Sequence, residues 1–349
     1  MRESRRVRRR DPDDLVARQL RRVPSGRKSL PGEFELIARL TADVSFSRRT
    51  ILGPGDDCAI IRRSSNDQLI TIDSMVENVH FKMGWGSAKQ TGIRALEVNL
   101  SDIAAMGGTP HSCVVNLAVR PSVELEYIHG LNQGLRTAAR RARVDVVGGN
   151  ITSARELSVT IALLGDAARN VLRRDAARIG DDVFVTGTLG DAALGWRLLA
   201  GEMRVPAEAR QPLVNRYLEP AARVQAGSRL ARLRPTPAAI DISDGLLQDL
   251  GHILERSKVG AEIDAASVPI SEAYRKAVGN DLTYALSGGE DYELLFCASA
   301  RLSASELTGR LGVAVTRIGR IVKGRGFKLS GAKLPLNSGF DQLRARRSR

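Results

Sequence analysis

Apolar and polar positions alternate along most of the chain as in an α/β protein, with short β-branched runs separated by longer stretches of helical periodicity. The pattern begins near Gly32. In the first half it predicts strands at 58–61, 69–72, 113–119, 145–147 and 157–164, and helices at 88–106 and 123–141. The sequence therefore indicates a layered fold in which helices pack on sheets.

A second block with the same alternation occupies the rest of the chain. It predicts a strand at 183–185, a helix from Asp191, a helix near 222–233 and a strand at 238–240, and it continues to about Val322. The apolar runs stop at 167–180, where arginine-rich residues connect the two blocks. We therefore divide the chain into a basic extension (1–30), an N-terminal domain (31–168), a C-terminal α/β domain (169–343) and a basic tail (344–349).

Composition supports a folded protein with two domains. The chain has 349 residues, of which 43% are hydrophobic and 26% charged, as is typical of globular proteins. It contains no apolar stretch of about 18 residues, and its N-terminus lacks the apolar core of a signal peptide. The three cysteines are widely spaced without a CxxC pair, which disfavours a zinc site or a disulfide framework. We expect a cytoplasmic protein that does not enter a membrane.

The net charge of +14 raises the question of a nucleic-acid partner. Most of this charge lies at the two ends. Residues 1–30 hold eleven Arg or Lys against four Asp or Glu, and residues 344–349 hold four arginines, which leaves +3 for positions 31–343. The nearly neutral body does not favour nucleic-acid binding, and only weak contact of the basic ends with phosphates is expected.

Acidic residues recur at the ends of predicted strands and the starts of predicted helices. The positions are Asp56, Asp57, Asp73, Asp102, Asp241 and Asp244. Together with the backbone N–H groups of Gly148 and Gly149, such carboxylates suit a site where magnesium bridges substrate phosphates. Each turn alone also fits a structural role, because Asp commonly forms turns and Ser243 would cap a helix that starts at Asp244.

The common kinase motifs are absent from the sequence. No GxxxxGK[ST] loop occurs, and the Gly187–Gly190 turn lacks its lysine and its glycine spacing. No HRD or DFG tripeptide of protein kinases occurs either. Any phosphoryl transfer by this chain therefore requires another scaffold.

Several long ordered motifs resemble one family across about 310 residues. They are GEFELI (32–37), GDDCA (55–59), ALEVNLSDIAAMG (95–107), VTGTLGD (185–191), AIDISDGL (239–246) and SGGEDYEL (287–294). In these motifs the chain resembles the thiamine-monophosphate kinases of the aminoimidazole-ribonucleotide-synthetase-like superfamily. The resemblance implies a two-domain α/β (α+β) fold with mixed sheets and helices. It also implies ATP-dependent, magnesium-assisted phosphorylation of thiamine monophosphate to thiamine diphosphate, the last step of thiamine diphosphate biosynthesis.

The same resemblance implies roles for individual residues. The magnesium ligands would be Asp57, Thr71, Asp73, Asp102, Asn150, Asp241 and Asp244. Contacts to ATP would come from Gly149, Asn150, Arg174 and Ser243, and contacts to thiamine monophosphate from His80, Glu290 and Phe340. No catalytic base is assigned, because the acceptor phosphate is already ionised at neutral pH. The N-terminal domain would carry the metal and ATP sites and form a homodimer.

The sequence departs from the family pattern at the glycine–glycine–aspartate motif, which reads Gly148–Gly149–Asn150. The neutral amide removes one unit of charge, so weaker magnesium binding is expected. Ile72 stands where threonine is usual, and Asp175–Ala176 stands where Ser–Gly is usual. The alternatives are another ATP-using enzyme of the superfamily, or a weakly active homologue that binds nucleotides or nucleic acid. Selenophosphate synthesis is disfavoured because no cysteine precedes Cys58.

Overall fold

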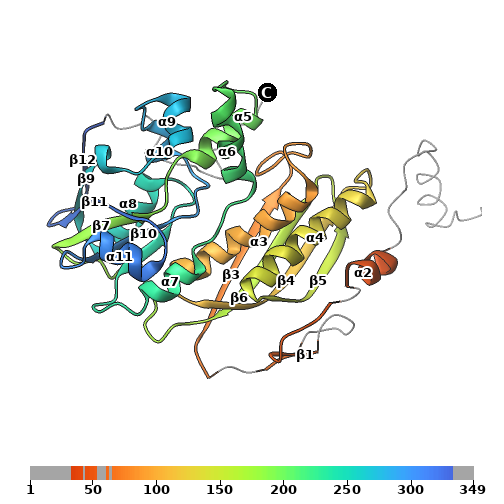
Figure 1. Ribbon diagram of the computed structural model, residues 1–349. Coiled ribbons are helices and arrows are strands. Elements are labelled where there is room, and N and C mark those ends of the chain that lie inside the picture. Colours follow the sequence, from red (N-terminus) through yellow and green to blue (C-terminus); the bar gives the residue numbers. More distant parts are fainter. Residues whose placement is uncertain (1–32, 42–43, 53–59, 63–64, 333–349) are drawn as a thin grey trace, which may run out of the picture.

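The computed structural model describes residues 33–41, 44–52, 60–62 and 65–332 and contains two mixed β-sheets with helices packed on them (Figure 1). The predicted α/β class with mixed sheets is confirmed. Asp57, Phe340, the extension 1–30 and the tail 344–349 lie outside the described residues. Among the described residues, no helix is long and apolar enough to span a membrane.

The first half contains a four-stranded sheet in the order β3-β6-β4-β5, in which only the β4–β5 pair is parallel. Its elements are α2 (Glu33–Thr41), β1 (Thr50–Leu52), β2 (Ile60–Ile61), β3 (Gln68–Val76), α3 (Ala88–Ala105), β4 (Thr109–Val119), α4 (Leu125–Ala142), β5 (Asp145–Ser153) and β6 (Ser158–Asp166). β1 and β2 pair separately. The helices and strands predicted for this half are confirmed in type, although β3, β4 and β5 are longer than predicted. Of the strand predicted at 58–61, positions 58 and 59 lie outside the described residues.

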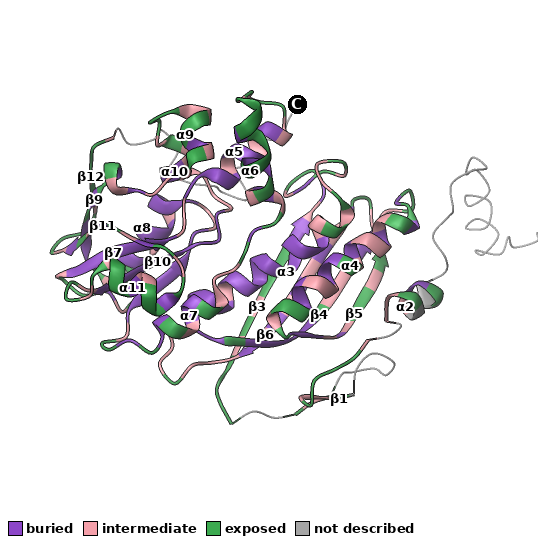
Figure 2. Ribbon diagram, in the orientation of Figure 1, coloured by how far each residue is buried: buried purple, intermediate pink, exposed green. Residues whose placement is uncertain are grey.

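Helix α3 is the central element of this half. Ser87 and Gln90 form a capping box that fixes its start. The helix is buried on nearly all sides because the sheet, α4 and the second half surround it (Figure 2). α3 and α4 approach so closely that a Cβ on Gly92 would lie 1.9 Å from the Leu131 carbonyl oxygen, and one on Gly134 would lie 1.9 Å from that of Lys89.

The two faces of the first sheet differ. Met75 on β3 packs with Ile161 on β6 and with Leu96 and Leu100 on α3, so this face is covered by helices. Side chains alternate along a strand, and Asp73 and Thr71 therefore share the helix-covered face. Ile70 and Ile72 point the other way and are 74% and 65% exposed. Asp73 lies inside β3, not at its end as predicted, because β6 pairs with β3 as far as Val76.

The second half contains a six-stranded sheet in the order β12-β9-β11-β7-β10-β8, with one parallel pair, β12–β9. Its elements are β7 (Asp181–Thr186), α5 (Asp191–Leu199), α6 (Ala207–Leu218), α7 (Val224–Leu230), β8 (Ala238–Asp241), α8 (Leu246–Ser257), β9 (Gly260–Asp264), the 3₁₀ turn η1 (Ala265–Ser267), α9 (Glu272–Val278), α10 (Thr283–Ser287), β10 (Leu294–Ser299), α11 (Ala304–Leu311), β11 (Val315–Val322) and β12 (Gly326–Ser330). The fold thus continues beyond Val322, where the apolar pattern was expected to stop, because β12 pairs along β9.

The two halves share a hydrophobic cluster. Ala104 and Ala105 at the end of α3 pack with Phe184 and Phe296 of the second sheet, whose rings stack at 5.3 Å. α3 also contacts α7 and β8. The two halves are therefore joined by one continuous hydrophobic cluster. The residues of α3 that face β8 belong to the candidate site described below.

Candidate functional site

Four acidic side chains from both halves meet where α3 crosses the middle of β3 and the end of β8. On α3, Asp102 accepts a hydrogen bond from the Thr71 hydroxyl of β3. The neighbouring Ser101 donates from Oγ to Asp241 Oδ2 at the end of β8, at 2.7 Å. Asp73 and Asp244 complete the group, since the charges of Asp102, Asp241 and Asp244 all act on Asp73. Residues far apart in the sequence therefore form one acidic cluster.

Burial raises the pKa of Asp73, Asp102 and Asp241, and neighbouring carboxylates raise it further for Asp73 and Asp241. Solvent still reaches Asp73, but partial enclosure by protein and the charges of Asp102, Asp241, Glu290 and Asp244 raise its pKa to about 7. Burial and the charge of Asp102 raise the pKa of Asp241 to about 6. Burial also raises the pKa of Asp102. Concentrated, mutually repelling oxygen ligands of this kind favour a bound cation.

Arg174 supplies positive charge beside the cluster. Its charge lowers the pKa of both Asp102 and Asp241, in opposition to burial. The adjacent Arg173 is instead paired with Asp175, at 2.6 Å from Nη2 to Oδ2, and is exposed. The geometry therefore separates the two arginines, and Arg174 is the one placed to meet an anion near the carboxylates.

Asp249 holds the loop that carries Asp241, Ser243 and Asp244. Its Oδ2 accepts hydrogen bonds from the backbone N–H groups of residues 243, 244 and 245, at 3.1, 3.2 and 3.1 Å. Helix α8 starts at Leu246 with Gly245 as its N-cap. The structural alternative for Ser243, a cap on a helix from Asp244, is therefore wrong, because the Asp249 carboxylate satisfies these N–H groups. Sequence reasoning missed Asp249, although an acidic residue in a first helical turn is a recognisable signal.

Replacing Asp249 with asparagine should lower kcat by about ten- to a hundredfold, the usual effect of losing a residue that orients metal ligands. Burial and the charges of Asp241 and Asp244 raise the pKa of Asp249 to about 7. Activity is therefore best compared at pH 8, where the carboxylate is ionised. A variant that retains full kcat at pH 8 would show that the loop does not depend on this carboxylate.

The segment Gly288–Glu293 contributes Glu290 to the site. Glu290 Oε2 lies 2.6 Å from Arg94 Nη2 on α3 and accepts a hydrogen bond from the Tyr292 hydroxyl at 2.8 Å. Its charge also helps to raise the pKa of Asp73.

His80 lies in the turn after β3. Its Nδ1 accepts a hydrogen bond from the Val76 N–H at 3.1 Å, and its carbonyl accepts one from the Tyr217 hydroxyl. The structure therefore places Glu290 beside the acidic cluster and ties the His80 turn to α6.

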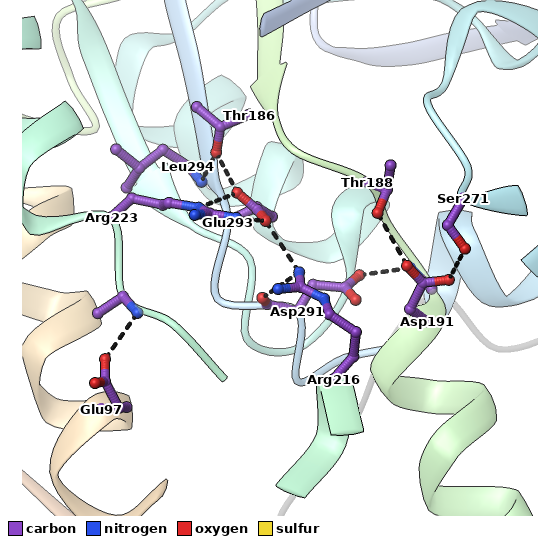
Figure 3. Close-up of polar contacts among 12 residues, drawn as sticks. Glu97, Thr186, Thr188, Asp191, Arg216, Arg223, Ser271, Asp291, Glu293 and Leu294 are labelled. Carbon is purple, nitrogen blue, oxygen red and sulfur yellow. Dashed lines mark hydrogen bonds and ion pairs between the residues drawn. The ribbon is translucent and has the colours of Figure 1, made fainter. Parts of the chain in front are cut away.

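The other acidic side chains of this segment are buried and bind the fold together (Figure 3). Glu293 is fully buried, accepts from the Thr186 hydroxyl at 2.6 Å, and pairs with both Arg216 and Arg223. Asp291 accepts from the Gly190 N–H at 2.8 Å. The sequence motifs at 185–191 and 287–294 are thus two loops that support each other, a role that sequence reasoning did not assign.

Gly149 and Asn150 are not part of this cluster within one chain. They lie on β5, at the opposite edge of the sheet from β3, and two strands at about 4.8 Å spacing lie between. Asn150 aligns with Asn116, Thr160 and Ser74 across the sheet, and its Nδ2 donates to Asn116 Oδ1 at 2.8 Å. Ser74 follows Asp73 directly, so this row occupies the open face, opposite the acidic cluster.

Gly149 has a structural reason to be glycine. A Cβ at this position would lie 2.1 Å from the Val115 carbonyl oxygen on β4. The sheet therefore excludes a side chain here whether or not a nucleotide binds.

The acidic cluster fits a magnesium ion that takes some of its ligands from the protein and the others from substrate phosphates. Among the described residues, no three His, Cys, Asp or Glu side chains form a ready-made metal cage. Magnesium commonly uses only one or two carboxylates and takes its other ligands from water and phosphates. The hard oxygen donors of Asp73, Asp102 and Asp241, with raised pKa values, match that chemistry.

Comparison with known proteins gives a consistent relationship across both halves. The chain matches the family described as AIR synthase related protein, N-terminal domain, over residues 55–167, and its C-terminal domain over 178–331. The thiamine-monophosphate kinase of Escherichia coli (strain K12) is 37% identical over 325 residues, which cover 89% of this chain and 98% of that protein.

Solved structures give the same relationship in three dimensions. The crystal structure of thiamine-monophosphate kinase from Stenotrophomonas maltophilia K279a has a TM-score of 0.76 at 37% identity and covers 88% of this chain and 99% of its own. The structure of AaThiL complexed with AMPPCP and TMP has a TM-score of 0.71 at 33% identity and covers 88% and 96%. With this identity over nearly the whole length of its relatives, the chain belongs to the thiamine-monophosphate kinase family.

Proposed function

We propose that this chain transfers the terminal phosphoryl group of ATP to the phosphate of thiamine monophosphate, giving thiamine diphosphate and ADP. The observation that carries the proposal is the acidic cluster formed by α3, β3 and β8, with Arg174 and Glu290 at its margin. Membership of the family supports the choice of substrate, and the relative AaThiL is complexed with AMPPCP and TMP.

The proposed chemistry joins two phosphates, so the main task of the site is to neutralise and align negative charge. Asp73, Asp102, Asp241 and Asp244, with Thr71, would hold magnesium, and Asp57 is proposed as a further ligand from outside the described residues. Magnesium held by these residues would supply positive charge against the two phosphates. Arg174 and Ser243 would contact ATP. His80, Glu290 and Phe340, the last also outside the described residues, would orient thiamine monophosphate.

No side chain is needed to remove a proton from the acceptor. An oxygen of the ionised phosphate attacks the terminal phosphorus of ATP, the bond from that phosphorus to the bridging oxygen breaks, and ADP leaves with the electron pair. The residues around the cluster therefore bind, align and screen charge, and we assign no catalytic base.

The first experiment measures ADP release in the cytoplasmic pH range with ATP, magnesium and either thiamine monophosphate or thiamine as acceptor. We expect ADP release only with the monophosphate, and its loss when EDTA removes the metal. ADP release without any acceptor, or equal rates with thiamine, would favour another ATP-using activity of the superfamily. The cytoplasm, where both ATP and magnesium are abundant, is the location we propose.

A homodimer formed through the open face of the first sheet is part of the proposal. That face carries Ile70, Ile72 and Val114, which are 74%, 65% and 38% exposed. Exposed apolar side chains grouped on one sheet face are typical of an interface. Because Asn150 lies on this face and away from Asp73, a role for Asn150 or Gly149 at ATP and magnesium requires a second copy of the chain.

Replacing Ile72 with glutamate should shift the protein from dimer to monomer in sedimentation velocity runs, because the dimer would have to bury a charge. The matched control is Ile179→Glu, since Ile179 is 64% exposed but lies in the connection between the two sheets. Equal sedimentation of wild type and Ile72→Glu as dimers would place the interface elsewhere.

A further inference from the structure

Arg94 of α3 is buried yet does not belong to the acidic cluster. It is 2% exposed, and its Nη2 lies 2.6 Å from Glu290 Oε2. Among the described residues, its Nε and Nη1 have no hydrogen-bond partner. Glu290 is therefore the charged partner of this guanidinium. Burying an arginine costs free energy that one ion pair does not fully offset, so we look for its role in how it holds the Glu290 carboxylate.

The flat face of Arg94 rests on Tyr217. The guanidinium carbon lies 3.6 Å from the centre of the Tyr217 ring, within the range of a cation–π contact. The Tyr217 hydroxyl in turn donates a hydrogen bond to the carbonyl of His80. A single stack of two side chains thus touches both described residues that are proposed to bind thiamine monophosphate, Glu290 on one side and His80 on the other.

The backbone around Glu290 needs such support. Glu290 and Tyr292 both have positive φ angles, 73° and 52°. Residues other than glycine adopt such angles only at a cost in conformational free energy. The Tyr292 hydroxyl donates to the same carboxylate oxygen that Arg94 contacts. Contacts from two directions therefore hold the Glu290 carboxylate in a conformation that the free segment would rarely adopt.

The stack also joins the two halves of the chain. Arg94 comes from the first half, whereas Tyr217 and Glu290 come from the second. Next to Tyr217 on α6, Arg216 pairs with buried Glu293 at 2.9 Å, which fixes the helix that carries the ring. The distance between His80 and Glu290 is thus set by side chains from both halves.

We propose that Arg94, stacked on Tyr217, is a positioning residue that fixes Glu290 relative to His80 and thereby determines the affinity for the phosphorylated acceptor. This inference rests on the proposed function. Arg94 touches neither the acidic cluster nor the ATP contacts, so its loss should affect the acceptor and leave ATP binding unchanged.

The test is steady-state kinetics of Arg94→Gln, Arg94→Lys, Glu290→Gln and the double variant Arg94→Gln/Glu290→Gln. We expect Arg94→Gln to raise KM for thiamine monophosphate about tenfold, as for one lost charge-assisted contact, with KM for ATP unchanged within about twofold. Arg94→Lys should recover part of the loss. The double variant should match Glu290→Gln alone, because Arg94 acts through that carboxylate.

The control is Arg49→Gln, which removes another arginine from a partly buried ion pair, at 2.6 Å from Asp166, in the same half of the chain. It should leave both KM values unchanged. An unchanged KM for the acceptor in Arg94→Gln would overturn the proposal. Equal increases for both substrates, additive effects in the double variant, or no recovery with lysine would do the same.

Two further measurements keep the test independent of folding and of the proposed function. If Arg94→Gln does not fold, Tyr217→Phe keeps the ring but removes the hydroxyl bonded to His80, and it should raise KM for the acceptor alone. If the wild type gives no product, the proposed function fails. Crystal structures of wild type and Arg94→Gln then test the positioning role of Arg94, and an unmoved Glu290 carboxylate in the variant would refute it.

Discussion

Replacing Asp241 with asparagine is expected to lower kcat about a thousandfold or more, because the change removes a charged oxygen ligand from the centre of the site. Asp241 is 4% exposed, lies at the end of β8, and binds the buried hydroxyl of Ser101. Asparagine has nearly the same shape and its carbonyl can still accept that bond. The loss should therefore come from charge and not from misfolding.

The same variant should be more stable than the wild type in the absence of metal. Burial and Asp102 raise the pKa of Asp241 to about 6, above its value in the unfolded chain. A carboxyl group whose folded pKa is raised destabilises the fold as pH rises from the unfolded toward the folded pKa, and the full penalty remains above it. At pH 8 without magnesium, Asp241→Asn should gain on the order of 1–3 kcal/mol in urea unfolding.

A matched control is Asp182→Asn on β7 of the same sheet. Asp182 is also buried, but it pairs with Arg317 at 2.8 Å and lies outside the acidic cluster. This variant should keep kcat within about twofold, because the Asp182–Arg317 ion pair lies away from the candidate site. Equal activity of Asp241→Asn and Asp182→Asn would mean that Asp241 does not act on the phosphates.

Replacing Glu293 with glutamine is expected to destabilise the protein by about 3 kcal/mol or more, because it leaves two arginines without their shared carboxylate. The Glu293 side chain is 1% exposed, while those of Arg216 and Arg223 are about a quarter exposed. Solvent around the arginines keeps the expected loss at the lower end of the range for buried pairs. Figure 3 shows how the carboxylate joins β7, α6 and the segment before α7.

Urea unfolding without ligands measures this effect, with Glu306→Gln as the control. Glu306 pairs with Arg310 one helical turn away on α11, where both side chains are largely exposed. That pair should contribute about 0.5 kcal/mol or less. If Glu293→Gln lowers the free energy of unfolding no more than the control does, the buried network contributes little to stability.

The sequence predicted those elements whose local signals agree with their surroundings. The helix at 88–106 was predicted from its helical periodicity, and in the structure a capping box at Ser87 fixes the same start. Strand β3 was underestimated, because Asp73 and Ser74 interrupt the apolar run while the pairing with β6 continues. Tertiary pairing, which no local pattern encodes, extends the strand.

The site was only partly accessible from sequence. Acidic turns indicated metal and phosphate chemistry, and the resemblance supplied the substrate. Neither contained the order of strands in the sheet, and so neither showed that Asn150 and Asp73, both implied as magnesium ligands, lie at opposite edges within one chain. Arg94 and Tyr217 were missed because a buried arginine on an apolar helix acquires meaning only from its partners, Glu290 and the ring beneath it.

The most direct test of the proposed phosphoryl transfer uses ATP with a radioactive terminal phosphoryl group, incubated with the full chain, magnesium and thiamine monophosphate. Chromatography then separates thiamine diphosphate, ADP and inorganic phosphate. We predict that the label appears in thiamine diphosphate, with one ADP formed for each diphosphate. Label that remains in ATP at saturating magnesium, or that appears only as inorganic phosphate, would contradict the proposal.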